Sequence, residues 1–237
     1  MFWAALRKGT VMTGFSEDTF SFLRRLAENN NREWFAEHKH EYEALVREPA
    51  FSFIETIAPE LQKVSPHFLA KASKMGGSLM RVYRDVRFSK NKLPYKTNVG
   101  IQFRHERGKD VHAPGFYVHI EPSEVFVGIG LWHPDAVALN AIRNHIDTYP
   151  ESWSGSISDE KFRKFFSFAG ESLKRAPKGY PLDHPMIEDL KRKDFIVLSQ
   201  LAPELCFEDD FAEIVMGYFK LATPLMQELC RAVRVPF

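Results

Sequence analysis

The sequence predicts an α+β protein with a helical N-terminal part, a central and largely antiparallel sheet, and C-terminal helices that pack on it. Two observations carry this prediction. Apolar residues recur every three or four positions up to about residue 64, alternate with polar residues from about 78 to 132, and return to the helical spacing after Pro134. The connections between the alternating runs are mostly too short for the helical crossovers that a parallel sheet needs.

The length and composition indicate a globular protein. Of its 237 residues, 44% are apolar and 27% are charged, and 21 phenylalanines predict an aromatic interior. We expect one domain over residues 13–237 behind an N-terminal extension, residues 1–12, with Met12 as the natural start. The apolar run in the extension is too short for a signal peptide, and no stretch of about 18 apolar residues occurs in the chain, so no membrane partner is predicted.

The helical part begins behind Ser16, a typical N-cap residue. Asn30 and Glu33 have the spacing of a capping box, which predicts a second helix as far as about residue 48. A third helix is expected to follow Pro49 and to end before Ser65.

Alternating apolar residues predict the strands. The candidate strands are residues 78–88, 99–104, 115–121, 124–132 and 195–199. Helices are expected from Pro134 to about Asp147, near 158–168, near 185–192, and from Asp210 through Pro224. The short connection between residues 121 and 124 predicts a hairpin.

Strand alternation sorts the side chains of this sheet into two faces. Arg84 falls on the apolar face with Val82, Val86 and Phe88, so its guanidinium requires a carboxylate partner or a hydrated rim. The other face is polar and has Gly128 and Gly130 beside it. Its members are Arg81, Tyr83, Asp85, Arg87, Gln102, Arg104, Tyr117, His119 and Glu121.

This polar face has two interpretations. Glycine inside a strand often marks the close approach of a ligand, which favours a pocket. One face of an antiparallel sheet is also commonly hydrated, and Asp85 alone would then balance Arg81 and Arg87.

Positive charge is concentrated around this region. Residues 81–109 contain nine Lys or Arg and two acids, a charge of +7, so the remaining chain carries −6. Arginine binds carboxylate and phosphate through two parallel hydrogen bonds. We therefore expect an anionic small molecule as the partner, and the sequence indicates no cofactor. The candidate binding residues are Arg81, Arg84, Arg87, Lys92, Lys96 and Arg104.

Two other functions remain open. The basic and aromatic sheet face has the composition of a nucleic-acid or protein interaction module, although nucleic acid is the less favoured partner at a net charge of +1. Alternatively, the arginine motif is a salt-bridge hub that fixes the strand and its loop. If the protein is an enzyme, the candidate catalytic residues are Asp85, Tyr95 and His119.

No metal site is predicted, because pairs such as His119 with Glu121 and His133 with Asp135 lack the ligand number of a zinc site. Cys206 and Cys230 lie in apolar surroundings without metal or disulfide spacing, which predicts reduced thiols and a cytoplasmic location.

The arrangement R81-x-x-R84-D85-x-R87-F88-x-x-x-K92-x-x-Y95 resembles the hallmark of a mainly bacterial family of conserved hypothetical proteins, a domain of unknown function. The segments N30-x-R-E-W-F35, R175-A-P-K-G-Y180 and D183-H-P185 are similar to further parts of that family. The resemblance covers roughly residues 13–235 and implies no particular activity.

Overall fold

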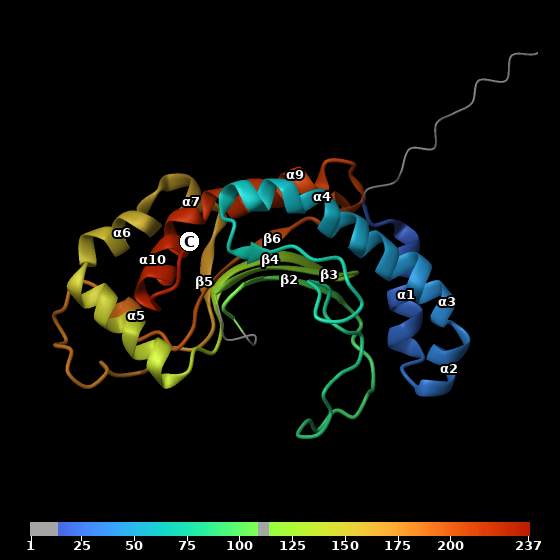
Figure 1. Ribbon diagram of the computed structural model, residues 1–237. Coiled ribbons are helices and arrows are strands. Elements are labelled where there is room, and N and C mark those ends of the chain that lie inside the picture. The colour runs from blue at the N-terminus through green and yellow to red at the C-terminus, as the bar shows by residue number, and fades with distance from the viewer. Residues whose placement is uncertain (1–13, 109–113) are drawn as a thin grey trace, which may run out of the picture.

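The computed structural model describes residues 14–108 and 114–237. The expected N-terminal extension with Met12 lies outside the described residues. So does Lys109, one of the nine cations counted over residues 81–109. The described chain folds around a six-stranded antiparallel sheet with the strand order β1-β2-β3-β4-β6-β5 (Figure 1). The α+β prediction is confirmed. The strands are β1 (Phe68–Leu69), β2 (Val99–His105), β3 (Gly115–Glu121), β4 (Glu124–Leu131), β5 (Ser167–Ala169) and β6 (Phe195–Leu201).

The N-terminal helices largely follow the prediction. They are α1 (Glu17–Glu28), α2 (Arg32–Glu37), α3 (Lys39–Tyr42), the π-helical turn η1 (Glu43–Arg47) and α4 (Glu48–Val64). Ser16 is the N-cap of α1 as expected, but Asn31 rather than Asn30 caps α2, where its Oδ1 accepts from the Trp34 N–H at 2.9 Å. No break precedes Pro49, because the wider turn of η1 leads directly into α4.

One face of the sheet is covered by helices. Figure 1 shows α4 and the C-terminal α9 (Phe211–Leu221) lying across it, and α10 (Thr223–Ala232) also contacts β4. The side chains expected on this face are buried, including Ile101, Phe103, Val118 and Val127. Phe103 and Phe116 meet Phe219 of α9 at ring-centroid distances of 5.9 and 4.6 Å. The core therefore lies between the sheet and these helices, as the alternation predicted.

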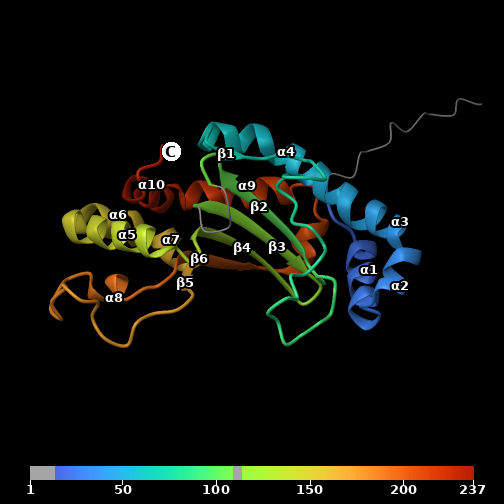
Figure 2. The ribbon, with the colours of Figure 1, turned by 60° about the horizontal axis from the view of Figure 1, so that its bottom comes forward.

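The opposite face of the sheet carries the polar side chains that the alternation placed together. Register pairs Gln102 with Tyr117, Tyr117 with Gly128, and His119 with Phe126, so these side chains lie together on three neighbouring strands. Figure 2 views the molecule from this side, and none of the described helices lies across the sheet there. This face is consequently accessible to a ligand.

The prediction of a strand over residues 78–88 is wrong. Leu79 pairs with Ile101 at the edge of β2, and the chain then leaves the sheet. Residues 81–96, which we call the motif loop, double back on themselves: Tyr83 pairs with Tyr95, and the Arg84 N–H donates to the Pro94 carbonyl at 2.9 Å. Because β2 begins only at Val99, no sheet edge is available beside residues 81–88. Alternation fails accordingly, and Phe88, expected on the core face, is 95% exposed.

The remaining helices are α5 (Ala136–Thr148), α6 (Pro150–Ser158), α7 (Glu160–Phe165), α8 (Ile187–Leu190) and the 3-10 turn η2 (Pro203–Phe207). The single helix expected from Asp210 is two helices that meet at Ala222, because Pro224 lies in the first turn of α10, where its missing N–H costs nothing. The sequence reading missed α6 and the short strands β1 and β5. None of the described helices has the length and apolar character that crossing a membrane requires.

Candidate functional site

The open sheet face contains a cleft of about 480 Å³. Its floor is formed by β2, β3 and β4, and one wall by the segment that leads into and out of the motif loop. Aromatic and aliphatic groups dominate the lining, with a few polar groups among them, as is usual for small-molecule sites. The lining residues are Met80, Lys96, Asn98, Gln102, Gly115, Phe116, Tyr117, His119, Glu124, Phe126, Gly128, Gly130, Trp132 and Ile196.

A chain of hydrogen bonds crosses the floor of the cleft. The Tyr117 hydroxyl lies 3.1 Å from Nδ1 of His119, and Nε2 of His119 lies 3.3 Å from Oε2 of Glu121. Thr97 donates to the other oxygen of Glu121 at 3.0 Å. The His119 ring also stacks on Phe126 at 4.6 Å and 8°, which fixes its plane.

The hydrogen-bond partners determine the tautomer of His119. The Tyr117 hydroxyl and the Asn98 amide, 3.4 Å away, both approach Nδ1 as donors, whereas the carboxylate of Glu121 faces Nε2 as an acceptor. The neutral ring therefore carries its proton on Nε2. Burial raises the pKa of Tyr117 to about 12, against a lowering hydrogen bond from Asn98, so its hydroxyl remains protonated. The floor thus presents a phenol whose single O–H donates to His119; it can turn toward a ligand, since the Asn98 amide then remains as a donor to Nδ1.

Lys96 brings a positive charge to the same cleft. Its backbone N–H donates to the Val82 carbonyl at 2.8 Å, which holds it at the base of the motif loop. The side chain is half-buried, and its ammonium lies 3.9 Å from the sulfur of Met80. Burial lowers the pKa of Lys96, and the charge of Arg81 lowers it further. Among the described residues no carboxylate pairs with Lys96.

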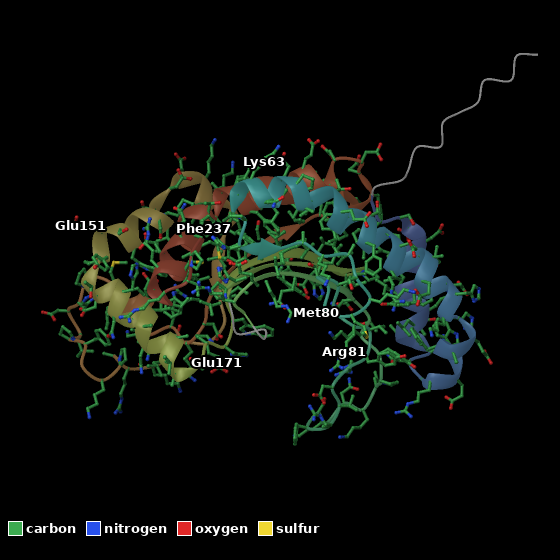
Figure 3. The ribbon with its side chains drawn as sticks, viewed as in Figure 1. Lys63, Met80, Arg81, Glu151, Glu171 and Phe237 are labelled. Atoms are coloured by element: carbon green, nitrogen blue, oxygen red, sulfur yellow. The ribbon has the colours of Figure 1, made fainter. Side chains whose placement is uncertain are left out.

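A smaller depression of about 370 Å³ adjoins the cleft, and both are lined by Met80 and Gln102. Arg81 and Arg104 lie in it, so two of the predicted binding arginines stand beside the cleft. Figure 3 shows Met80 next to the sheet and Arg81 farther along the motif loop. Neither arginine forms an ion pair with any described acid.

The other predicted cations lie away from the cleft, toward the tip of the motif loop. Arg87 forms a two-pronged pair with Asp85, at 2.9 and 2.7 Å, and both side chains are largely exposed. Lys92 donates to the Val86 carbonyl at 2.8 Å. Arg84 is half-buried in the loop and forms no ion pair with a described residue. The structure therefore divides the predicted binding set between the cleft side and the tip.

The three catalytic candidates are not brought together by any contact in the described chain. The Arg87 hydrogen bonds lower the pKa of Asp85 to about 2, which makes this carboxylate a weak base. Tyr95 is 4% exposed and stacks on Phe35 at 4.1 Å, so it anchors the motif loop to α2. Of the three, His119 alone lines the cleft.

Asn30 also holds Tyr95 in place, through the backbone of Tyr95. Its amide donates to the Tyr95 carbonyl and its Oδ1 accepts from the Tyr95 N–H, both at 3.0 Å. Sequence reasoning assigned Asn30 to helix capping and missed this role, because a contact across 65 residues leaves no local pattern. It also missed Met80, Asn98 and Ile196 as cleft residues.

Comparison with known families identifies the chain. A model described as conserved hypothetical protein (DUF2461) matches residues 18–227, nearly the whole described chain. The chain belongs to this family. Membership in the DUF2461 family confirms the resemblance found in the sequence, and the description of the family names no activity. No curated protein matches the sequence of this DUF2461 protein.

Proposed function

We propose that the sheet cleft of this DUF2461 protein binds a small organic molecule that carries a carboxylate or phosphate group. The anionic group would lie between Lys96 and Arg81, and the organic part over the aromatic floor. The observation that carries the proposal is that Lys96 lines the cleft, Arg81 lines the adjoining depression, and neither forms an ion pair with a described residue.

Electrostatics support this assignment. Two cations close enough for one to lower the pKa of the other repel each other, and the partial burial of Lys96 adds a desolvation cost to its charge, whereas Arg81 is exposed. An anion between them would offset both costs. Asp85 forms its ion pair with Arg87, and the charge of Arg81 adds only a smaller lowering of the Asp85 pKa. Arginine and lysine together are the usual receptors for carboxylate and phosphate.

The salt-bridge hub receives less support from the geometry. The ion pair inside the motif joins Asp85 and Arg87, whose side chains are 47% and 76% exposed. An exposed pair contributes little to stability, since water and salt screen it. The contacts that hold the motif loop come instead from Tyr95, through its ring and its backbone.

The loop tip supports a second candidate function, the binding of single-stranded nucleic acid. Phe88 is 95% exposed, the Arg87 guanidinium lies 5.8 Å from its ring centroid, and Lys90 and Lys92 follow it in the sequence. An exposed ring with neighbouring positive charges suits base stacking and phosphate contacts. This function predicts an affinity that falls steeply with salt and is lost in Phe88→Ser.

The proposal is tested by calorimetric titration of the purified protein with small carboxylates and sugar phosphates. We compare Arg81→Leu, on the cleft side, with Arg87→Leu, at the tip. A ligand that binds the wild type should lose on the order of tenfold or more in affinity in Arg81→Leu, because a charge-assisted hydrogen bond contributes about 1.5–3 kcal/mol. Arg87→Leu should bind as the wild type does.

Equal losses of affinity in both variants would contradict a site centred on the cleft. They would indicate that the ligand also contacts the arginine at the loop tip. Binding that survives Arg81→Leu unchanged would contradict the proposal directly. Thermal unfolding gives an independent reading, since a ligand at a hundred times its Kd stabilises the native state by about 2.7 kcal/mol.

We further propose that this function operates in the cytoplasm. Cys206 and Cys230 are buried free thiols, as predicted, and burial raises the pKa of each to about 12. Unpaired thiols of this kind are common in a reducing compartment.

A further inference from the structure

The chemical setting of Lys96 differs from that of an ordinary surface lysine. A lysine amine becomes a nucleophile when it loses its proton near neutral pH, and two conditions favour that loss: removal from water and a neighbouring cation. Lys96 meets both, since it is half-buried in the cleft and adjacent to Arg81. No described carboxylate forms an ion pair with its ammonium group; Glu124, which also lines the cleft, accepts from Gln200 instead.

The surroundings of Lys96 also suit a covalent reaction with a carbonyl compound. The cleft of about 480 Å³ accommodates a small metabolite, and its lining is largely apolar around the amine. Tyr117 supplies a protonated hydroxyl in the same cleft, and this hydroxyl is hydrogen-bonded to Nδ1 of His119. On the other side of Met80, the depression with Arg81 and Arg104 offers a place for a carboxylate.

We propose that Lys96 forms an imine with a small 2-oxo acid, whose carboxylate is bound on the Arg81 side and whose carbonyl carbon lies at the lysine amine. This inference rests on the proposed function, which it deepens by naming the substrate class and the reacting residue.

The reaction balances without any further reagent. The lone pair of the neutral Lys96 amine attacks the carbonyl carbon, a C–N bond forms, and the π electrons of the C=O bond move to oxygen. The two protons of the amine pass to that oxygen, which leaves as water, and the C=N double bond remains. Tyr117 is the group in the cleft that can donate a proton to the departing oxygen and regain one, once its O–H turns from Nδ1 of His119, which the Asn98 amide then keeps paired.

The test traps this imine with sodium borohydride in the presence of pyruvate at neutral pH. Borohydride delivers hydride to the imine carbon and water protonates the nitrogen, which leaves a stable secondary amine. Intact mass and peptide mapping then locate the label, whose mass is that of pyruvic acid less one oxygen atom. We expect label in the Lys96 peptide to exceed that in the Lys63 peptide, because the cleft holds the oxo acid beside the Lys96 amine and burial lowers the pKa of that amine.

Two variants make the result specific. Lys96→Arg keeps a positive charge in the cleft, but a guanidinium does not form the imine, and the labelled peptide should disappear. Lys63→Met removes a lysine that is 72% exposed and pairs with Glu60 on α4. Figure 3 shows Lys63 on the helix-covered side of the sheet. This control should leave the labelling of Lys96 unchanged.

Lactate provides a matched ligand control, because it keeps the carboxylate of pyruvate but has a hydroxyl in place of the carbonyl. Lactate should give no adduct and should reduce the labelling by pyruvate through competition. Label spread evenly over surface lysines, or undiminished in Lys96→Arg, would overturn the inference.

The inference and the proposed function can fail separately. If pyruvate or lactate binds in an Arg81-dependent way and no adduct is trapped, the anion site stands and the imine is excluded. If neither binding nor trapping occurs with any carboxylate or phosphate tested, both are overturned.

Discussion

At the scale of single residues, long-range polar contacts decide where the functional groups stand. Asn30 satisfies both backbone groups of Tyr95, and Tyr95 in turn holds the base of the motif loop from which Lys96 enters the cleft. Asn30 is 8% exposed, so water replaces its hydrogen bonds poorly. The position of Lys96 therefore depends on a residue 66 positions earlier in the chain.

Asn30→Ala should lower the free energy of unfolding by about 2–6 kcal/mol, because it leaves a buried N–H and a buried carbonyl of Tyr95 unpaired, each at about 1–3 kcal/mol. Urea unfolding followed by circular dichroism measures this change. The neighbouring Asn31→Ala is a matched control: it removes an exposed helix cap and should cost only about 1 kcal/mol. Equal losses of unfolding free energy in the two variants would show that the hydrogen bonds to Tyr95 stabilise the fold no more than an exposed helix cap does.

At the scale of elements, the sequence predicted what depends on local periodicity and failed where pairing decides. β2, β3, β4 and β6 were predicted because each has a buried face with a regular period of two. The motif loop has the same alternation, but a strand needs a neighbour, and the edge of β2 is already occupied by residues 78–80 where it can pair. Periodicity therefore misled for residues 81–88: Val82 is buried as expected, but Phe88, placed on the same core face, is exposed.

The candidate site was predicted in the same uneven way. The alternation placed Gln102, Tyr117 and His119 on one accessible face, and these residues do line the cleft. It could not separate Lys96, which lines the cleft, and Arg81, which lines the adjoining depression, from the cations toward the loop tip, because that division follows from the turn of the motif loop. Cleft binding by any of these cations remains a prediction.

Gly130 in β4 shows how the backbone of a neighbouring strand restricts which residue fits at a position. Gly130 has φ +132°, and a Cβ at this position would lie 2.0 Å from the Phe195 carbonyl oxygen of β6. The sequence suggested that Gly130 leaves room for a ligand. The structure gives a nearer cause, since a side chain here would collide with the backbone of the adjacent strand.

Gly130→Ala should destabilise the fold by about 3 kcal/mol or more, because backbone strain and a backbone clash act together. Gly155→Ala serves as its control: Gly155 lies inside α6 with open space around it, so the added methyl group should stabilise the helix by about 0.5–1 kcal/mol. Thermal unfolding of the two variants should therefore shift in opposite directions. A Gly130→Ala protein as stable as the wild type would contradict the close approach of β4 and β6.

At the scale of the whole molecule, the end of the chain returns to the edge of the sheet. Phe237 packs on Phe68 of β1 at 5.8 Å, and the Pro236 carbonyl accepts from Nε2 of His105 in β2 at 2.8 Å. Nδ1 of the same ring accepts from the Arg107 N–H at 3.1 Å. His105 is thus held as the neutral tautomer with its proton on Nε2, and it couples the last residues to the strand that also supplies Gln102 and Arg104 to the site.

This coupling predicts a dependence of stability on pH. Burial lowers the pKa of His105 below its ordinary value of 6.5, outweighing the hydrogen bond to Pro236, which raises it. As pH falls below 6.5, the unfolded chain takes up this proton before the folded chain does, so the free energy of unfolding decreases toward acid, by at most about 1.4 kcal/mol per pH unit for one group. His67, Glu106 and Arg107 face the ring, and their charges modify the shift without reversing it.

Unfolding in urea at a series of pH values between 5 and 6.5 measures this slope. His105→Gln should flatten it, because glutamine does not titrate, whereas His40→Gln, which alters an exposed histidine of α3, should leave the slope as in the wild type. The comparison uses slopes rather than absolute stabilities, so a general weakening caused by His105→Gln does not obscure the result. A wild-type slope that persists in His105→Gln would assign the acid sensitivity to another group and would remove the C-terminal contact as its cause.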